Sequence, residues 1–286
     1  MAAARDILLI TGHSGAGKSV ALRTLEDSGY YCVDNLPASL LAELVARLEH
    51  STPQPLAIGV DTRSVGTLDA LPSQIFALQE RGHPVRLLFL EARHEVLVRR
   101  FSETRRPHPL ADPAQTLPET IDAEQRLLMP IAEQAHRIDT SDTPASELAR
   151  WVRAFAEAPS AALRLVFQSF GFKHGTPLGM DLVFDVRCLP NPHYDRELRA
   201  QTGRDPAVAA FLAASPEARA MREDIGAFLR TWLPRYRDEP RSYLTVGIGC
   251  TGGRHRSVWL AERLAVDCAD LAGILVRHRD IEREQR

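Results

Sequence analysis

One segment near the start of the chain constrains its fold more than any other. It reads Gly12-His13-Ser14-Gly15-Ala16-Gly17-Lys18-Ser19 and matches the pattern GxxxxGK(S/T). An apolar run at residues 7–11 precedes it, and apolar residues at helical spacing follow it. Glycines let the backbone curl so that successive N–H groups face inward, and the N-terminus of the following helix adds partial positive charge. Strand, glycine-rich loop and helix in this order predict a phosphate-binding P-loop in an α/β fold.

The chemistry of a P-loop gives its last two residues defined roles. Lys18 is predicted to reach the β- and γ-phosphates of a nucleoside triphosphate, and Ser19 to ligate Mg²⁺ together with a carboxylate. Asp61 follows the apolar run at residues 56–60 and is the first choice as catalytic partner of Lys18. Asp34 is the second choice, because parallel strands end at the same edge of a sheet. An acid that merely caps a turn is the alternative. We expect ATP or GTP with Mg²⁺, and the sequence does not rank the two nucleotides.

Four arginines crowd into a short segment after the apolar run at residues 85–90. They are Arg99, Arg100, Arg105 and Arg106, and four prolines follow within residues 107–118. In small-molecule kinases a mobile segment supplies arginines to the transferring phosphoryl group, so this cluster favours a P-loop kinase as the alternative function. A solvated basic helix face is the plainer interpretation. Residues 107–118 are expected to form a lid or a surface loop.

Strands and helices alternate along the whole chain. Residues 156–162 are small and turn-prone, and the alternation resumes at residue 163. Strands that alternate with helices favour parallel sheets. The pattern predicts an N-terminal P-loop kinase-like domain with a parallel sheet at residues 1–156. A second, smaller α/β domain is predicted at residues 163–286.

Prolines predict two local features of the helices. Residues 121–137 have helical periodicity with an interruption expected at Pro130, because proline lacks the N–H that a helix interior uses. Thr143 and Pro144 have the pattern of an N-cap followed by proline at the first helical position, which predicts a helix through residue 155.

A second glycine-rich turn lies between the apolar run at residues 243–250 and the helix predicted at residues 255–268. It lacks a P-loop lysine but is rich in hydrogen-bond donors, which favours a phosphate or sulfate site. Two alternatives stay open. The spacing of Cys250 and Arg256 also fits a thiolate nucleophile with a phosphate-binding arginine, for which Asp185 could serve as the acid, and a purely structural turn is the other. The candidate site residues are Cys250, Thr251, Gly252, Gly253, Arg254, His255, Arg256 and Ser257.

A polar cluster follows the strand predicted at residues 182–186. It consists of Asp185, Arg187, Asn191 and His193. Arginine and histidine suit a phosphate group, whereas aspartate and asparagine suit hydroxyl groups or an amine, so the cluster could complete a sugar-phosphate pocket. Loop residues that only satisfy one another are the alternative.

Composition limits the remaining classes of function. The net charge is −2, so the chain as a whole carries no electrostatic signature of a nucleic-acid or membrane-surface protein. Its four cysteines have no CxxC spacing, which argues against a zinc site or a disulfide framework. No apolar run approaches the length of a membrane span, and the first residues lack a signal-peptide pattern. We expect a cytoplasmic protein without a membrane partner.

Several long blocks together resemble the RapZ family. They are residues 12–19, 31–37, 104–110, 169–175, 184–193 and 249–257. The resemblance implies ATP at Gly12–Ser19, a guanine-nucleotide element at Asp61, Thr62, Arg63 and Ser64, and slow ATPase and GTPase activity in a regulatory protein. It also implies that the C-terminal domain senses glucosamine-6-phosphate through the two C-terminal clusters described above.

The resemblance further implies RNA and RNase E as partners, and we expect a homo-oligomer. Enteric members of the family end in a lysine-rich stretch that binds small RNA. Here residues 277–286 hold four arginines interleaved with three acids. Because phosphate contacts dominate RNA affinity, this departure puts RNA binding by the tail in doubt.

Overall fold

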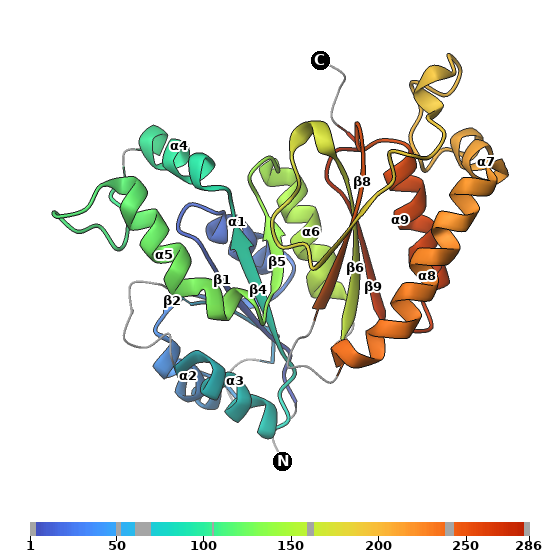
Figure 1. The fold of residues 1–286 in the computed structure, drawn as a ribbon. Coiled ribbons are helices and arrows are strands. Elements are labelled where there is room, and N and C mark those ends of the chain that lie inside the picture. Colours follow the sequence, from blue (N-terminus) through green and yellow to red (C-terminus); the bar gives the residue numbers. More distant parts are fainter. Residues whose placement is uncertain are drawn as a thin grey trace. The chain divides into compact units, whose positions relative to one another are not determined.

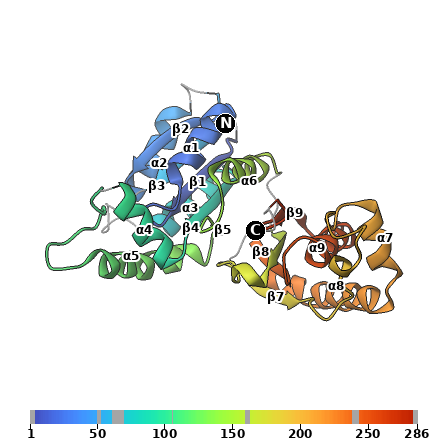
Figure 2. The same cartoon turned by 90° about the horizontal axis from the view of Figure 1, so that it is seen from above.

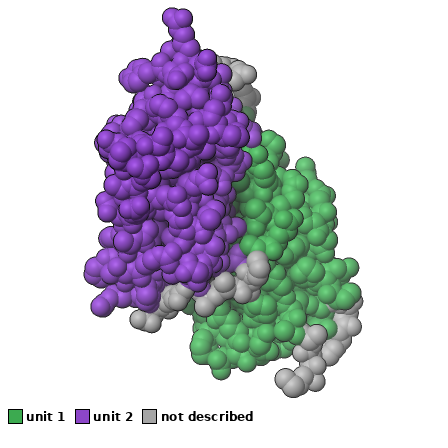
Figure 3. All heavy atoms as spheres, turned by 90° about the vertical axis from the view of Figure 1, so that its right-hand side faces the viewer, with its two compact units in different colours: residues 1–160 green, residues 161–286 purple. Residues whose placement is uncertain are grey.

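The computed structural model describes residues 4–49, 53–60, 70–104, 106–158, 163–237 and 243–282. The chain divides into two compact units, Met1–Ser160 and Ala161–Arg286, which Figure 3 draws in separate colours. Each unit is built on a parallel sheet with its own helices (Figure 1). The predicted α/β class of both units is confirmed.

The sheet of the N-terminal unit has five parallel strands in the order β2-β3-β1-β4-β5. β1 is central and completely buried, and Ile7 lies opposite both Leu56 and Val85 in the neighbouring strands. Such full burial explains why β1 is a continuous apolar run rather than an alternating one. The strands are β1 (Ile7–Gly12), β2 (Tyr31–Leu36), β3 (Leu56–Val60), β4 (Val85–Glu91) and β5 (His136–Asp139).

Helices cover both faces of this sheet (Figure 2). Ile7 and Leu9 pack with residues of α2, α3 and α5, while α1 contacts β1, β3 and α6. Successive strand residues point to opposite faces, so one short apolar strand serves both layers. The helices are α1 (Lys18–Asp27), α2 (Leu41–Leu48), α3 (Leu71–Glu80), α4 (His94–Thr104), α5 (Leu117–Ala132) and α6 (Ala145–Glu157).

The C-terminal unit has a four-stranded parallel sheet in the order β7-β8-β6-β9. Its core joins Leu165 and Phe167 of β6 to apolar residues of three helices, and Trp259 is the largest of these. The strands are β6 (Arg164–Gly171), β7 (Leu182–Asp185), β8 (Tyr243–Cys250) and β9 (Gly273–His278), and the helices are α7 (Pro206–Ala214), α8 (Pro216–Arg237) and α9 (Arg256–Asp267).

Both proline-based predictions need correction. α5 runs through Pro130 instead of breaking there and ends before residue 137. Pro130 is exposed and lies in the last turn of the helix, where only a little helix remains to be disturbed. In α6 the N-cap is Pro144 itself, and the hydroxyl of Thr143 donates to the carbonyl of Asp139. Among the described residues, no helix combines the length and apolar character that a bilayer crossing requires.

Candidate functional site

The P-loop connects β1 to α1 and is held against β4. Gly12 has a φ of 133°, and a Cβ atom at this position would lie 2.0 Å from the carbonyl oxygen of Leu90. The next residue, His13, donates its N–H to that same oxygen at 2.9 Å. Only glycine permits this conformation and this close approach of two backbones. The turn that opens the loop is therefore fixed by the sheet.

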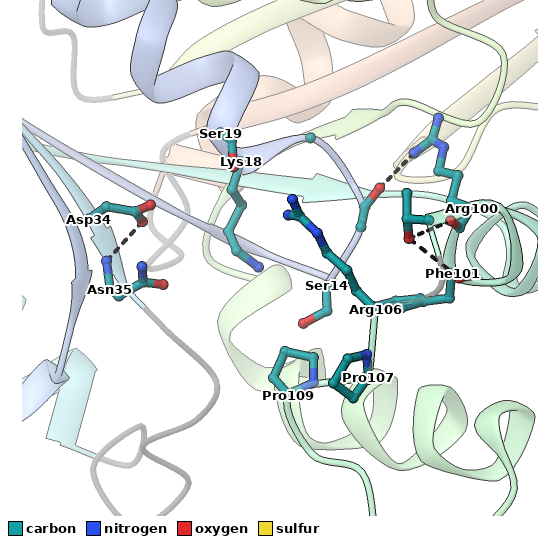
Figure 4. A pocket seen from close by; sticks show the side chains of 13 residues that line it. Ser14, Lys18, Ser19, Asp34, Asn35, Arg100, Phe101, Arg106, Pro107 and Pro109 are labelled. Atoms are coloured by element: carbon teal, nitrogen blue, oxygen red, sulfur yellow. Dashed lines mark hydrogen bonds between the residues drawn. The ribbon is translucent and has the colours of Figure 1, made fainter.

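A pocket of about 520 Å³ lies over this loop (Figure 4). Asp34 and Asn35 at the end of β2 lie on one side of Lys18, and Arg106 lies on the other. Ser19 lines the same pocket, next to Lys18 in the chain. The full lining is Ser14, Gly15, Gly17, Lys18, Ser19, Asp34, Asn35, Arg100, Phe101, Thr104, Arg106, Pro107 and Pro109.

Three predicted P-loop residues, Gly12, His13 and Ala16, support the conformation of the loop but do not line the pocket. The carbonyl of Gly12 accepts a hydrogen bond from Lys18 Nζ at 2.6 Å. Ala16 is fully buried. His13 packs edge-on against Phe89, and burial lowers its pKa to about 4 even though the charge of Glu124 opposes this shift. His13 is therefore neutral at pH 7 and contributes to packing.

Glu124 of α5 braces the loop from inside. Its carboxylate accepts the N–H of Ser14 at 2.9 Å and the hydroxyl of Ser14 at 2.6 Å. The same carboxylate lies 3.3 Å from Nε2 of His108, which is itself buried. A single buried acid thus joins the P-loop to the segment that carries Arg106, Pro107 and Pro109 into the pocket. Sequence reasoning missed Glu124 because 110 residues separate it from Ser14.

The arginine cluster is divided by the fold. Arg100 lines the pocket and donates to the carbonyls of Gly15 and Thr140. Burial and the neighbouring charge of Arg99 lower the pKa of Arg100. Arg106 lines the pocket and is exposed, whereas Arg99 is exposed outside the lining and Arg105 lies outside the described residues. Two of the four arginines therefore face the same pocket as Lys18.

The predicted magnesium partners are described only in part. Asp61, Thr62, Arg63 and Ser64 lie outside the described residues. Asp34, the second choice, lines the pocket with Ser19, and its carboxylate accepts the N–H of Asn35 at 2.8 Å. A serine hydroxyl and a carboxylate are ligands of the kind that Mg²⁺ prefers. The residues present in this pocket therefore fit an Mg²⁺–nucleotide.

The second glycine-rich turn connects β8 to α9. Gly253 has a φ of 75°, and a Cβ atom there would lie 2.7 Å from the backbone nitrogen of Gly171 in β6. The turn is thus packed directly on the neighbouring strand. A pocket of about 310 Å³ opens beside it, and we call it the β8–α9 pocket. Its lining is Lys173, Asn191, His193, Cys250, Thr251, Gly252, Arg254, His255 and Arg256.

The β8–α9 pocket brings together eight of the twelve residues that the sequence nominated for it. The other four are Asp185, Arg187, Gly253 and Ser257. Asp185 and Arg187 form an exposed ion pair at 2.6 Å, and the Arg187 guanidinium lies over the ring of Phe172. Gly253 and Ser257 instead contact the sulfur of Cys250 from within the turn.

Lys173 joins the lining although the motif around the turn did not point to it. It lies in the short 3-10 turn Phe172–His174 after β6. Lys173, Arg254 and Arg256 give the pocket three cationic side chains, and none of its nine described lining residues is Asp or Glu. The pocket is therefore suited to an anion.

Arg256 is held in place by the backbone. Its guanidinium donates to the carbonyls of Arg187 and Leu189, at 2.7 and 3.1 Å, and to the hydroxyl of Thr251. Within the described part of the chain, Nε of Arg256 and Nε2 of His255 have no hydrogen-bond partner. Both side chains are over nine-tenths buried and line the pocket. Unpaired buried polar groups are costly, so they point to a ligand.

Comparison with known proteins assigns both units. Residues 5–159 match the family model described as the RapZ-like N-terminal domain, and residues 163–282 match the RapZ C-terminal domain. The chain belongs to the RapZ family. The resemblance stated from the sequence blocks is thereby confirmed.

This RapZ-family chain has close relatives of similar length. A nucleotide-binding protein of Dechloromonas aromatica is 53% identical over 277 residues, which is 96% of this chain and 99% of the relative. One of Aromatoleum aromaticum is 55% identical over 279 residues, which is 97% of this chain and 96% of the relative.

Solved structures resemble about half of this RapZ-family chain. The tunicamycin resistance protein of Deinococcus radiodurans has a TM-score of 0.41 at 19% identity and covers 54% of this chain and 96% of that one. Shikimate kinase of Acinetobacter baumannii has a TM-score of 0.36 at 17% identity, with coverage of 54% and 94%.

Proposed function

We propose that the N-terminal unit binds ATP or GTP with Mg²⁺ and hydrolyses it slowly, in a cytoplasmic regulatory protein. The observation that carries this proposal is the placement of Lys18 and Ser19 in one pocket with Asp34, Arg100 and Arg106. The names of the relatives, which are nucleotide-binding proteins, support it. We further propose that the β8–α9 pocket binds an amino-sugar phosphate and thereby senses it.

Different residues of the N-terminal pocket would bind different parts of an Mg²⁺–nucleoside triphosphate. Lys18 Nζ, now hydrogen-bonded to the carbonyl of Gly12, turns to the β- and γ-phosphates when nucleotide binds. Ser19 and Asp34 would hold Mg²⁺, which supplies charge neutralisation at the phosphates. Arg106 is exposed, lines the same pocket and would bind the terminal phosphate.

Replacing Lys18 tests the nucleotide site. We expect Lys18→Ala to weaken binding of a fluorescent ATP or GTP analogue about 10- to 100-fold, because a charge-assisted hydrogen bond contributes about 1.5–3 kcal/mol. Arg99→Ala is the matched control, since Arg99 is exposed outside the pocket lining. Equal affinities of the wild type and the Lys18→Ala variant would sink the site assignment. Competition with unlabelled ATP and GTP in the same assay ranks the two nucleotides.

A small-molecule kinase is the second candidate function. The pocket continues past Lys18 to Asn35, which leaves an amide group opposite the arginines for an acceptor. Transfer to a defined acceptor at roughly 1–100 per second would favour the kinase, whereas phosphate release to water alone favours the regulatory hydrolase. Asn35→Ala sharpens the test, because a kinase that holds its acceptor through this amide would lose acceptor phosphorylation while keeping nucleotide binding.

The anion-suited lining supports the amino-sugar phosphate proposal for the C-terminal unit. Lys173, Arg254 and Arg256 suit a phosphate, and Asn191 offers an amide to hydroxyl groups or an amine. Calorimetric titration of glucosamine-6-phosphate, with glucose-6-phosphate as competitor, measures both affinity and amine selectivity. We expect Lys173→Ala to weaken binding and the exposed control Arg187→Ala, outside the lining, to leave it unchanged. Absence of binding by the wild type would overturn the sensing role.

We propose no RNA contact through Arg277 and Arg279 of the C-terminal segment. Each has 4% of its surface exposed, and Arg279 donates to the carbonyls of Gly171 and Gly175. Basic side chains that neutralise RNA phosphates must reach solvent. Arg283 and Arg286 lie outside the described residues. Small RNA, RNase E and a homo-oligomeric state stay predictions from the sequence.

A further inference from the structure

The sulfur of Cys250 has polar contacts that an anion-binding pocket does not require. Its Sγ accepts the N–H of Gly253 at 3.2 Å and lies 3.1 Å from Oγ of Ser257. Both partners are buried, and Ser257 lies in the first turn of α9. Hydrogen bonds to sulfur and the positive end of a helix are the contacts that stabilise a thiolate. A cysteine that only fills space needs none of them.

The same pocket also holds the groups that a phosphate needs beside a nucleophile. Arg256 begins α9, is 96% buried, and has an Nε without a hydrogen-bond partner within the described residues. Lys173 and Arg254 add positive charge, while no acidic side chain lines this described pocket. Cys250 itself is part of the lining. A phosphate bound by these cations would therefore lie beside Cys250.

We propose that the β8–α9 pocket hydrolyses phosphomonoesters with Cys250 as the nucleophile, which rests on the proposed binding of a phosphorylated ligand there. The thiolate attacks phosphorus, a P–S bond forms, and the P–O bond to the alcohol breaks while His193 donates a proton to the leaving oxygen. A water then attacks phosphorus, His193 accepts its proton, and the P–S bond breaks. Inorganic phosphate leaves, and Cys250 returns as a thiolate.

The two histidines of the pocket have different roles. Burial and the neighbouring charge of Arg254 lower the pKa of His255, so this ring is neutral and cannot serve as the acid at pH 7. His193 is half-buried in the same lining, and we assign the proton transfer to this ring. Asp185, the acid suggested by the sequence, is paired with Arg187 outside the lining and does not take this role.

Four variants of the full-length chain separate the steps. With p-nitrophenyl phosphate and glucosamine-6-phosphate as probes, we expect Cys250→Ser to lose phosphate release from both while still binding the sugar phosphate. Ser257→Ala should accumulate a phosphoenzyme, seen in acid-quenched intact-mass spectra, because the departing thiolate loses a hydrogen bond. His193→Asn should slow formation of the phosphoenzyme from the sugar phosphate about 10²-fold or more but from p-nitrophenyl phosphate little, since p-nitrophenolate leaves without a proton, and it should slow hydrolysis of the phosphoenzyme equally for both. Cys188→Ser, an exposed cysteine outside the lining, should behave as wild type.

The outcomes distinguish this proposal from the one on which it rests. Wild-type binding of glucosamine-6-phosphate, with phosphate release no faster than in Cys250→Ser, overturns the nucleophile and leaves the sensing role intact. No binding and no turnover of either probe by a folded wild type overturns both. Turnover in the wild type that Cys250→Ser abolishes, with a phosphoenzyme in Ser257→Ala, establishes the hydrolase. Circular dichroism of each variant checks that its fold is preserved.

Discussion

Glu124 keeps a negative charge inside the N-terminal unit. Burial alone would raise its pKa, but hydrogen bonds from His108 and Ser14 and the charge of Lys18 outweigh burial and lower it to about 2. The folded-state pKa is therefore below the unfolded value of about 4.3. The stability that this ionised group contributes is present above that unfolded value and is lost as the pH falls toward 2.

We expect Glu124→Gln to lower the free energy of unfolding at pH 7 by about 3 kcal/mol, which is the energy that corresponds to the lowered pKa. The variant should also lose less stability than the wild type between about pH 4.5 and 2. Urea unfolding across this range measures both effects. Glu133→Gln, an exposed acid just after the same helix, is the control. Parallel pH curves for the wild type and Glu124→Gln would contradict the buried-charge account.

Single residues show what the sequence could and could not predict about the sites. The P-loop was predictable because its eight residues are contiguous and their order matches the backbone geometry. Glu124 and Lys173 gave no such signal, because each reaches its site through the pairing of distant segments. Arg187 was predicted to line the β8–α9 pocket but does not. It lies close in sequence to pocket residues, but its own ion pair with Asp185 keeps it out of the lining.

At the scale of elements, α5 tolerates a proline in its last full turn. Pro130 removes one backbone hydrogen bond, while Pro118 lies in the first turn, where the missing N–H costs nothing. We expect Pro130→Ala to stabilise the unit by about 1–2 kcal/mol, which is less than the gain of about 3 kcal/mol in a helix interior, because Pro130 lies in the last turn and because the unfolded chain gains freedom. Thermal unfolding measures the change. Pro118→Ala should bring no gain, and a Pro130→Ala variant that melts with the wild type would contradict this reasoning.

The β8–α9 turn depends on one glycine and tolerates change at its neighbour. Gly253→Ala places a methyl group 2.7 Å from the Gly171 nitrogen at a positive φ, so we expect a loss of more than 1 kcal/mol in stability and weaker anion binding. Gly252→Ala is the matched control for stability, because a Cβ atom there meets nothing within 4 Å. Denaturant unfolding and phosphate titration compare the two. Equal stabilities would show that the turn is not packed on β6.

Most elements were predictable because strand and helix periods alternate clearly. The apolar strands at residues 7–11, 85–90 and 243–250 were found within one residue at either end. The errors arose where proline rules compete with tertiary packing. α5 continues through Pro130, with Leu128 and Ile131 packed in the core on either side of it. The helix propensities of single residues do not include the stabilisation that comes from burying Leu128 and Ile131 in the core.

For the whole molecule, the two units have separate sheets and separate cores. We expect nucleotide at 100 times its Kd to stabilise the N-terminal unit by about 2.7 kcal/mol, leaving the C-terminal unit unchanged, and glucosamine-6-phosphate to do the reverse. Differential scanning calorimetry should resolve two transitions that move separately. At the same nucleotide concentration, Lys18→Ala should reduce the nucleotide-dependent stabilisation to about 0.4–1.4 kcal/mol and leave the shift with glucosamine-6-phosphate unchanged. One shared transition that moves with either ligand would instead show that the units unfold together.

The order of the strands in each sheet also determines when each unit can fold during synthesis on the ribosome. β6 opens the second unit, yet its hydrogen-bonding neighbours are β8 and β9, where Arg164 lies opposite Tyr243 and Gly273. The P-loop unit can complete its sheet once β5 has emerged, at residue 139. β6 must wait with both edges open until β8 is complete at residue 250, and with one edge open until β9 is complete at residue 278. Since domains fold as they emerge, a nascent chain holds a finished nucleotide-binding unit beside an apolar strand that chaperones can recognise.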